Sequence, residues 1–204
     1  MNVSELNSIA KAMVSNGKGI LAADESTPTI KKRFDTIGAE STFDTRQRYR
    51  EMLFTTEGLN QYIGGVILFD ETLRQSTSED ILFPKYLSDL GIVPGIKVDA
   101  GAKSLAGYEG ETVTEGLDGL RDRLAEYSNL GAKFAKWRAV IHISESVPSS
   151  FCIKSNAHAL ARYAALCQEI NIVPIVEPEV LMDGTHDISR CEEVTADVLD
   201  VVFS

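Results

Sequence analysis

The chain has 204 residues, of which 44% are hydrophobic and 25% are charged, and its formal net charge is −10 at pH 7. This composition is typical of a soluble globular protein, and the acidic balance argues against a generic nucleic-acid surface, which would be basic. No apolar run approaches the roughly 18 residues that a membrane span requires. A secretory signal is not visible at the N-terminus. We therefore expect a cytoplasmic protein with neither nucleic-acid nor membrane partners.

Apolar runs with strand character alternate along the chain with amphipathic helical stripes. We expect helices at about 6–14, 27–38, 45–54, 84–91, 117–130, 155–167 and 187–202. Thr27, Ser155 and Asp187 are the expected N-caps of three of them. In the helix at 45–54, Tyr49, Met52 and Leu53 are expected to face inward. Strands are expected at 19–23, 62–69, 93–98, 133–141 and 172–176, and the polar, glycine-rich stretch at 100–116 is expected to be a long loop.

Five strand-then-helix units in series predict an α/β fold. An open doubly wound sheet and part of a (β/α)₈ TIM barrel both fit this order. A complete barrel typically needs about 250 residues, and an open five-stranded parallel sheet would leave two unpaired edges. We expect an incomplete barrel, made of about the first five strands and their helices. Because no linker-like stretch divides residues 1–204, a single domain is expected.

The cysteines and histidines favour packing over a metal site. Cys152, Cys167 and Cys191 are odd in number and contain no C-x-x-C pair, which suits reduced core thiols. The three histidines share no metal-ligand spacing. We therefore expect no metal site.

Charged residues end or interrupt four of the apolar runs. They are Asp24 in GILAAD, Lys97 and Asp99 in VPGIKVD, Lys136 and Arg138 in FAKWRAV, and Glu177 and Glu179 in VPIVEPEVL. In a barrel these strand ends converge on one rim. Lysines beside carboxylates at the partly buried end of a barrel are suited to bind anions. Their pKa values can also be shifted for proton transfer. A lysine near another cation is also able to act as an amine nucleophile toward a ketone.

Five segments resemble those of class I fructose-bisphosphate aldolases in order and spacing. They are GKGILAADEST, YIGGVILFDETLRQST, VPGIKVD, FAKWRAV and VPIVEPEVL, and the resemblance extends from about Ser4 to Ser204. It implies a (β/α)₈ barrel that cleaves fructose 1,6-bisphosphate reversibly to dihydroxyacetone phosphate and glyceraldehyde 3-phosphate, in glycolysis and gluconeogenesis. It also implies a Schiff base on a lysine, no metal or other cofactor, and a homotetramer in the complete form.

The same resemblance implies roles for individual residues. Asp24 would handle the proton of the hydroxyl beside the bond that breaks, Glu177 would form and dehydrate the carbinolamine, and Lys136 would orient that chemistry. The implied substrate-binding residues are Ser26, Thr29, Arg33, Lys97, Arg138 and Glu179. For Arg33 a solvated basic face beside Lys31 and Lys32 is an open alternative. For Thr29, a polar residue at a helix start is an equally open one.

The chain also departs from the family pattern. In the family the Schiff-base lysine lies on the sixth strand, so we expect these 204 residues to hold the acid/base half of the site without the covalent half. Pro28 occupies a position that animal enzymes give to glycine, Ala100 replaces a usual lysine, and 142–151 matches poorly. Two alternatives remain: a non-catalytic, truncated barrel that binds a sugar phosphate or a protein, and another Schiff-base aldolase of the barrel type.

Overall fold

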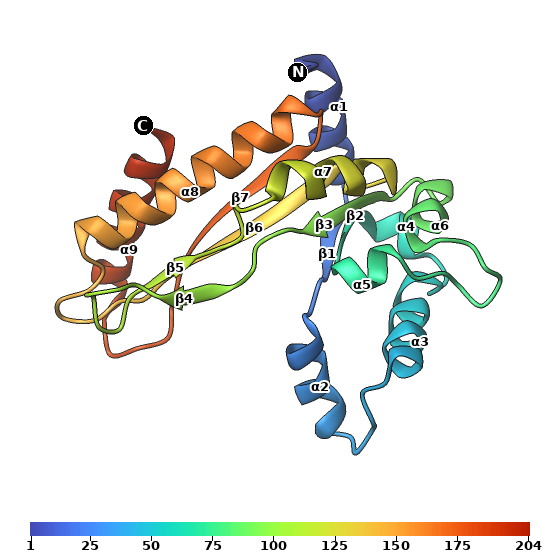
Figure 1. Ribbon diagram of the computed structural model, residues 1–204, viewed down its shortest axis with the longest axis horizontal. Helices are drawn as coiled ribbons and strands as arrows, with labels where there is room; N and C mark the ends of the chain where they lie inside the picture. Colours follow the sequence, from blue (N-terminus) through green and yellow to red (C-terminus); the bar gives the residue numbers. More distant parts are fainter.

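A computed structural model describes residues 1–204, and its centre is a five-stranded parallel sheet (Figure 1). The strands are β1 (Gly19–Ala23), β2 (Ile63–Leu68), β3 (Val93–Lys97), β6 (Phe134–Ile141) and β7 (Val173–Val180). They lie in the order β1-β2-β3-β6-β7, which is also their order in the chain. The sequence therefore predicted the α/β class and the parallel half-barrel sheet. β1 and β7 form its two edges.

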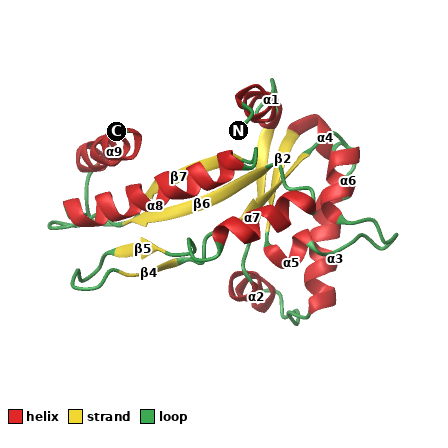
Figure 2. Cartoon of the chain, turned by 45° about the horizontal axis from the view of Figure 1, so that its top comes forward, coloured by secondary structure: helices red, strands yellow, loops and turns green.

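Nine helices connect and flank the strands. They are α1 (Val3–Met13), α2 (Thr27–Asp35), α3 (Phe43–Phe54), α4 (Leu59–Tyr62), α5 (Asp70–Leu73), α6 (Phe83–Asp89), α7 (Leu120–Asn129), α8 (Ser150–Glu169) and α9 (Ile188–Phe203). The long helix α8 runs along β6 and β7 (Figure 2). Helices α2 and α3 extend away from the sheet, and the two chain ends lie on the opposite side of the molecule (Figure 1). None of these helices combines the length and apolarity needed to cross a membrane.

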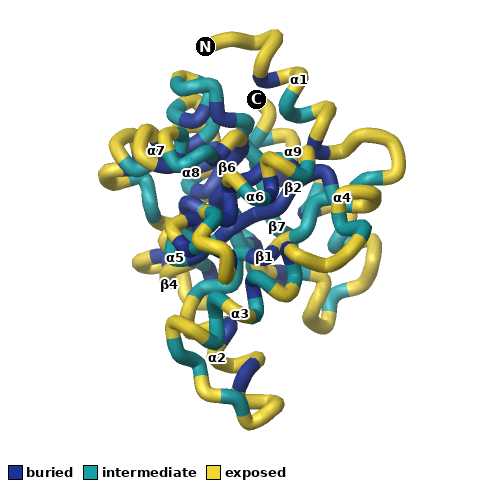
Figure 3. The backbone as a smooth tube through the Cα atoms, turned by 90° about the vertical axis from the view of Figure 1, so that its right-hand side faces the viewer, coloured by how far each residue is buried: buried dark blue, intermediate teal, exposed yellow.

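The two faces of the sheet differ because successive side chains of a strand point to opposite sides. On β6, Ala135, Trp137 and Ala139 are fully buried against the helices. The Trp137 ring lies 5.5 Å from the ring of Tyr163 on α8, so this face holds the main core, and buried backbone runs through the centre of the molecule (Figure 3). We call the other face, which carries Phe134 and Lys136, the inner face.

The inner face is apolar at the amino ends of the strands. The buried ring of Phe134 packs there with Ile67 of β2 and Met13 of α1. Gly95 of β3 is the register partner of Phe134, and a Cβ atom at Gly95 would fall well inside van der Waals contact of the Phe134 ring. Glycine at this position therefore makes room for the aromatic ring, and Gly64 of β2 makes room for the backbone of α1 at Met13.

The segment at 100–116, which we expected to be a loop, contains an antiparallel hairpin, so that prediction is wrong. Its strands are β4 (Ala102–Ser104) and β5 (Thr112–Thr114). The hairpin is held on β6 by threonine hydroxyls: Thr112 Oγ1 donates to Val140 O at 2.9 Å, and Thr114 Oγ1 donates to Arg138 O at 2.8 Å. The sequence did not reveal this hairpin for two reasons. Strands of three residues are too short to show an alternating pattern, and the threonines contact residues that are far away in the sequence.

Several element boundaries also differ from expectation. Helix α8 begins at Ser150, and its N-cap is Ser149, whose hydroxyl accepts from Cys152 N at 3.1 Å, so the predicted cap at Ser155 is wrong. Ser26 rather than Thr27 occupies the N-cap position of α2. β7 continues to Val180 and so includes both of its glutamates. The four-residue helices α4 and α5 are too short to show a helical period.

Helix α3 confirms two of its three expected inward residues: Leu53 packs against the main core, and the Tyr49 ring lies 5.7 Å from that of Phe34. The third is wrong. Met52, expected inside, is 58% exposed, whereas Arg50 and Phe54 are 2% and 0% exposed. Phe54 packs edge-on against Phe83 of α6 with ring centroids 5.1 Å apart. A hydrophobicity pattern could not identify Arg50 as a buried residue of this helix, because it is charged.

The close fit of Gly95 and Phe134 leads to a stability prediction. Gly95→Ala should destabilise the fold by about 1–3 kcal/mol, because the added methyl group overpacks the inner face. Urea unfolding followed by circular dichroism measures this change. Combining it with Phe134→Leu should cost less than the sum of the two single changes.

Gly19→Ala is the matched control, because nothing lies within 4 Å of a Cβ atom at that strand position. Its effect should stay within about 0.5 kcal/mol. Equal destabilisation by both alanine substitutions would contradict the packing account.

Candidate functional site

Charged side chains occupy the carboxyl end of the inner face. Strand register pairs Lys97 with Lys136, Arg138 with Glu177, and Val140 with Glu179, so these side chains share one face. Asp24 directly follows β1 at the same end. We define the charged cluster as Asp24, Lys97, Lys136, Arg138, Glu177 and Glu179. These six and Asp99, which follows β3, are the seven charged residues that end or interrupt four of the apolar runs of the sequence, and the structure brings them to the same end of the sheet.

Lys136 lies at the centre of this cluster. Its Nζ atom is 3.3 Å from Asp24 Oδ2 and 3.3 Å from Glu177 Oε2. The side chains of Lys136 and Asp24 are 12% and 13% exposed, and that of Glu177 is 33% exposed. Two carboxylates therefore share one largely buried ammonium group.

The contact between Lys136 and Asp24 requires a curved sheet. β2 and β3 lie between β1 and β6, so a flat sheet would separate the two backbones by roughly 14 Å, or three strand spacings. Side chains standing perpendicular to a flat sheet would not converge across that distance. The observed ion pair shows that the strands curve around the inner face.

Burial raises the pKa of the Glu177 carboxyl above its usual value. The charge of Lys136 and its hydrogen bond act in the opposite direction, the nearby charge of Glu179 raises the pKa further, and Arg138 lowers it. Desolvation is the largest of these effects. A glutamate whose proton is held closer to neutral pH is suited to general acid and base catalysis.

Lys97 is held at the edge of the cluster by Asp99. Its Nζ atom donates to Asp99 O at 3.0 Å and forms an ion pair with Asp99 Oδ1. The buried Asp99 carboxylate also accepts from Gly101 N at 3.0 Å and Arg138 N at 3.4 Å. Asp99 thereby ties β3 to β6. From the sequence, Asp99 was expected at the same rim as Lys97, but it was given no individual role.

Arg138 and Glu179 form a second, more exposed ion pair through Nε and Oε2. Their side chains are 43% and 36% exposed. An ion pair in contact with water contributes little to stability. An anionic ligand would therefore displace this partner of Arg138 at low cost.

The three remaining predicted residues lie on the connection from β1 and on α2. Ser26 Oγ and Thr29 Oγ1 are 3.0 Å apart at the start of the helix. Arg33 Nη1 lies 2.5 Å from Glu25 Oε1 and is largely exposed. Asp24, Glu25 and Ser26 are consecutive in the chain, so the residues at the start of α2 directly follow a member of the charged cluster. The structure shows no direct contact between Arg33 and Lys136, so the site has two parts.

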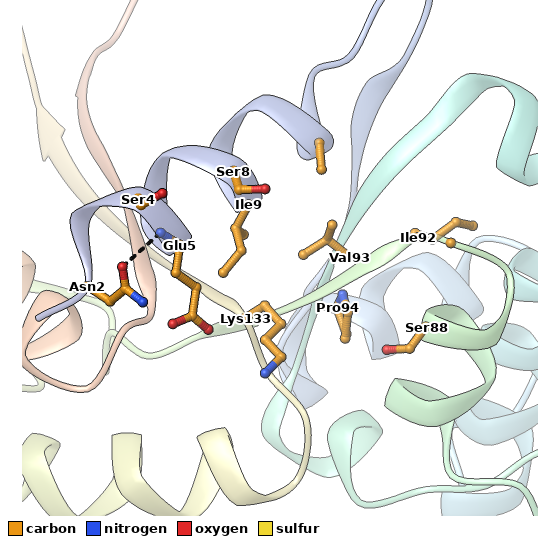
Figure 4. A pocket seen from close by; sticks show the side chains of 12 residues that line it. Asn2, Ser4, Glu5, Ser8, Ile9, Ser88, Ile92, Val93, Pro94 and Lys133 are labelled. Atoms are coloured by element: carbon orange, nitrogen blue, oxygen red, sulfur yellow. Dashed lines mark hydrogen bonds between the residues drawn. The ribbon is translucent and has the colours of Figure 1, made fainter.

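A separate pocket of about 650 Å³ lies between α1 and the amino ends of β3 and β6 (Figure 4). Glu5 and Lys133 are its charged lining residues. None of the predicted site residues lines it. In parallel α/β proteins the chemistry lies at the carboxyl ends of the strands. We therefore place the candidate active site at the charged cluster.

The Glu177 environment leads to a pH prediction. The carboxyl carbon of Glu177, followed by NMR, should titrate above the usual glutamate pKa. The pKa should rise further in Lys136→Met and fall in Glu179→Gln, because those variants remove the effects of an opposite and a like charge.

Because the folded state holds this proton more tightly than the unfolded chain, stability also depends on it. The contribution of Glu177 is fully present below the unfolded pKa and is lost as pH rises through the raised folded pKa. The surface variant Glu193→Gln should leave the titration unchanged. A Glu177 pKa that does not respond to either cluster variant would refute this electrostatic account.

Comparisons with known proteins agree with the site. Residues 5–204 match the family model of glycolytic class-I fructose-bisphosphate aldolase. The chain is 62% identical over 203 residues to "Probable fructose-bisphosphate aldolase class 1" of Xanthomonas campestris pv. campestris, covering 100% of this chain and 61% of that protein. It is 55% identical over 200 residues to "Fructose-bisphosphate aldolase C" of Carassius auratus, covering 98% of this chain and 55% of that protein.

A solved structure extends the likeness to three dimensions. Fructose-bisphosphate aldolase from Plasmodium falciparum, crystallised with TRAP and a small-molecule inhibitor, superposes with a TM-score of 0.95 at 49% identity. The match covers 98% of this chain and 58% of that one. The chain therefore spans less than two thirds of the length of these relatives.

Proposed function

Because the chain belongs to the class I fructose-bisphosphate aldolase family, we propose that the protein cleaves fructose 1,6-bisphosphate reversibly to dihydroxyacetone phosphate and glyceraldehyde 3-phosphate. The placement of Lys136 between Asp24 and Glu177, 3.3 Å from each, is the observation that carries this proposal. Two carboxylates and a cation at the carboxyl ends of curved strands suit acid/base work on a sugar. The reaction belongs to glycolysis and gluconeogenesis and takes place in the cytoplasm.

The chemistry proceeds through an imine. A lysine amine adds to the C2 ketone, and Glu177 protonates the carbinolamine hydroxyl so that it leaves as water. Asp24 then takes the proton of the C4 hydroxyl while the C3–C4 bond breaks. The bonding electrons move to the iminium nitrogen, the aldehyde leaves, and an enamine remains. Protonation at C3 and hydrolysis of the imine release dihydroxyacetone phosphate.

The other cations of the site bind the substrate in this proposal. Lys97 and Arg138 hold sugar oxygens or a phosphate, and Glu179 shapes the pocket through its pair with Arg138. Ser26, Thr29 and Arg33 hold a phosphate at the start of α2, where backbone N–H groups favour anions. Lys136 lies between two carboxylates, an arrangement that suits it to orient charge rather than to attack the ketone.

We propose that the complete protein is a (β/α)₈ barrel in one domain and that it forms a homotetramer. The curved sheet with strands in chain order and two unpaired edges supports the barrel. An apolar pocket of about 430 Å³ borders β7 and is lined by Leu6, Leu160 and Val176 among others. By the resemblance, the sixth strand would pair beside β7 and carry the amine nucleophile. Residues 1–204 would then contribute the acid/base and phosphate-binding groups.

The central test uses the protein as isolated from its source. We expect it to cleave fructose 1,6-bisphosphate at an undiminished rate in the presence of EDTA, because an amine activates the ketone. Glu177→Gln should lower kcat by about 10²–10⁴-fold, whereas Glu193→Gln should not. A coupled assay of triose phosphate formation measures both. Activity abolished by the chelator would refute the proposal.

A trapping experiment tests the origin of the amine. A polypeptide of residues 1–204, incubated with dihydroxyacetone phosphate and borohydride, should gain no covalent adduct and show no turnover. The complete protein should gain one adduct, located by mass spectrometry. An adduct at Lys136 in either polypeptide would contradict the role proposed for this residue.

The non-catalytic alternative makes the opposite prediction in the same experiments. A sugar-phosphate-binding module would bind fructose 1,6-bisphosphate without imine formation in any form of the protein. The raised pKa of Glu177 beside Lys136 favours catalysis, because binding alone does not require a carboxyl group poised for proton transfer. A preference for singly phosphorylated ketoses would instead favour a different Schiff-base aldolase.

A further inference from the structure

Arg50 is a fully buried cation that the proposed mechanism does not use. It lies on α3, and only 2% of its surface is exposed. Its Nη1 atom is 2.5 Å from Glu25 Oε2, and its Nη2 atom donates to Glu25 O at 3.0 Å. The third donor, Nε, lies 3.4 Å from Thr72 Oγ1. Arg50 thus holds both the backbone and the side chain of Glu25, the residue between Asp24 and Ser26.

Glu25 is shared by two arginines in very different environments. Its side chain is 8% exposed, and its other oxygen, Oε1, lies 2.5 Å from Arg33 Nη1. The Arg33 side chain is 58% exposed, whereas that of Arg50 is 2% exposed. One carboxylate therefore joins a buried cation to a cation that is more than half exposed to water, and whose Nη1 atom also lies 3.5 Å from Tyr49 Oη.

This arrangement decides the cost of moving Arg33. A buried carboxylate that loses its only cation is strongly destabilised, because its charge is left uncompensated. With Arg50 in place, Glu25 keeps one guanidinium partner when Arg33 turns away. Arg33, whose own side chain is 58% exposed, then leaves Glu25 without leaving that carboxylate unpaired, and gains a phosphate, which arginine binds well through paired donors.

We propose that Arg50 is a positioning residue for the phosphate end of the site. It neutralises Glu25 so that Arg33 exchanges this carboxylate for a phosphate of the substrate. This proposal rests on the proposed function, in which Arg33 binds a sugar phosphate. Without Arg50, Glu25 and the phosphate compete for the same guanidinium.

The test is a double-substitution cycle on the complete protein. Inorganic phosphate and fructose 1,6-bisphosphate are titrated at low ionic strength, and binding is followed by NMR. Arg50→Gln should weaken both affinities by roughly fivefold to twentyfold, because Glu25 then retains Arg33. Arg50→Gln combined with Glu25→Gln should restore them to within about twofold of the unmodified protein, since no carboxylate competes. This rescue separates competition for Arg33 from a purely structural role of Arg50.

Arg46→Gln is the matched control. Arg46 also lies on α3 and forms a bidentate ion pair with Glu71. Its Nε and Nη2 atoms donate to Glu71 Oε1 and Oε2 at 2.7 and 2.6 Å. Losing this pair should lower stability without changing phosphate affinity. Glu25→Gln alone keeps the proposal falsifiable even where Arg50→Gln does not fold. It should tighten phosphate binding about twofold to fivefold, because it removes the competing charge.

Three outcomes would overturn the proposal. In the first, Glu25→Gln leaves the phosphate affinity unchanged. In the second, Arg50→Gln loses phosphate affinity and the added Glu25→Gln does not restore it. In the third, the unmodified protein does not bind phosphate. Aldolase turnover is measured separately, so normal turnover with any of these results rejects the Arg50 proposal alone. Absent turnover together with normal phosphate binding and rescue would instead reject the proposed reaction.

Discussion

The ion pair between Lys136 and Asp24 depends on the curvature of the whole sheet, because it joins two strands that are not neighbours. That curvature is accommodated at the amino ends of the strands. There Gly95 leaves space for the Phe134 ring, and α1 closes the apolar end through Met13. The inner face is therefore apolar at one end and charged at the other. Position along the strand decides whether an inner residue contributes to packing or to chemistry.

Exposure divides the cations of the site into two kinds. Arg50 and Lys136 are nearly buried and contact carboxylates that would be costly to leave unpaired. Arg33 and Arg138 are 58% and 43% exposed, so their guanidinium groups stay in contact with water. In the proposed function, the buried pairs fix the geometry and the exposed arginines exchange a carboxylate for a phosphate.

The strands and the charged cluster were predictable because both depend on local sequence. Long apolar runs with Lys97 and Lys136 inside them indicate buried strands with functional groups, and the structure brings these side chains together. Arg50 was not predictable, because its partner Glu25 is 25 residues away and nothing in the helical pattern marks a buried arginine. The hairpin at 102–114 was missed for a related reason, since side-chain hydrogen bonds to β6 hold it in place.

The energetics of the cluster bear on the choice between catalysis and binding alone. Placing Asp24, Lys136 and Glu177 together out of water costs desolvation energy, and apolar replacements of buried ion pairs are often neutral or stabilising. Stability therefore does not account for the three side chains. Anion binding needs cations, yet two carboxylates here reduce the positive charge that a phosphate would experience. Proton transfer needs such carboxylates, one of them with a raised pKa, so the arrangement favours an enzyme over a sugar-phosphate-binding module.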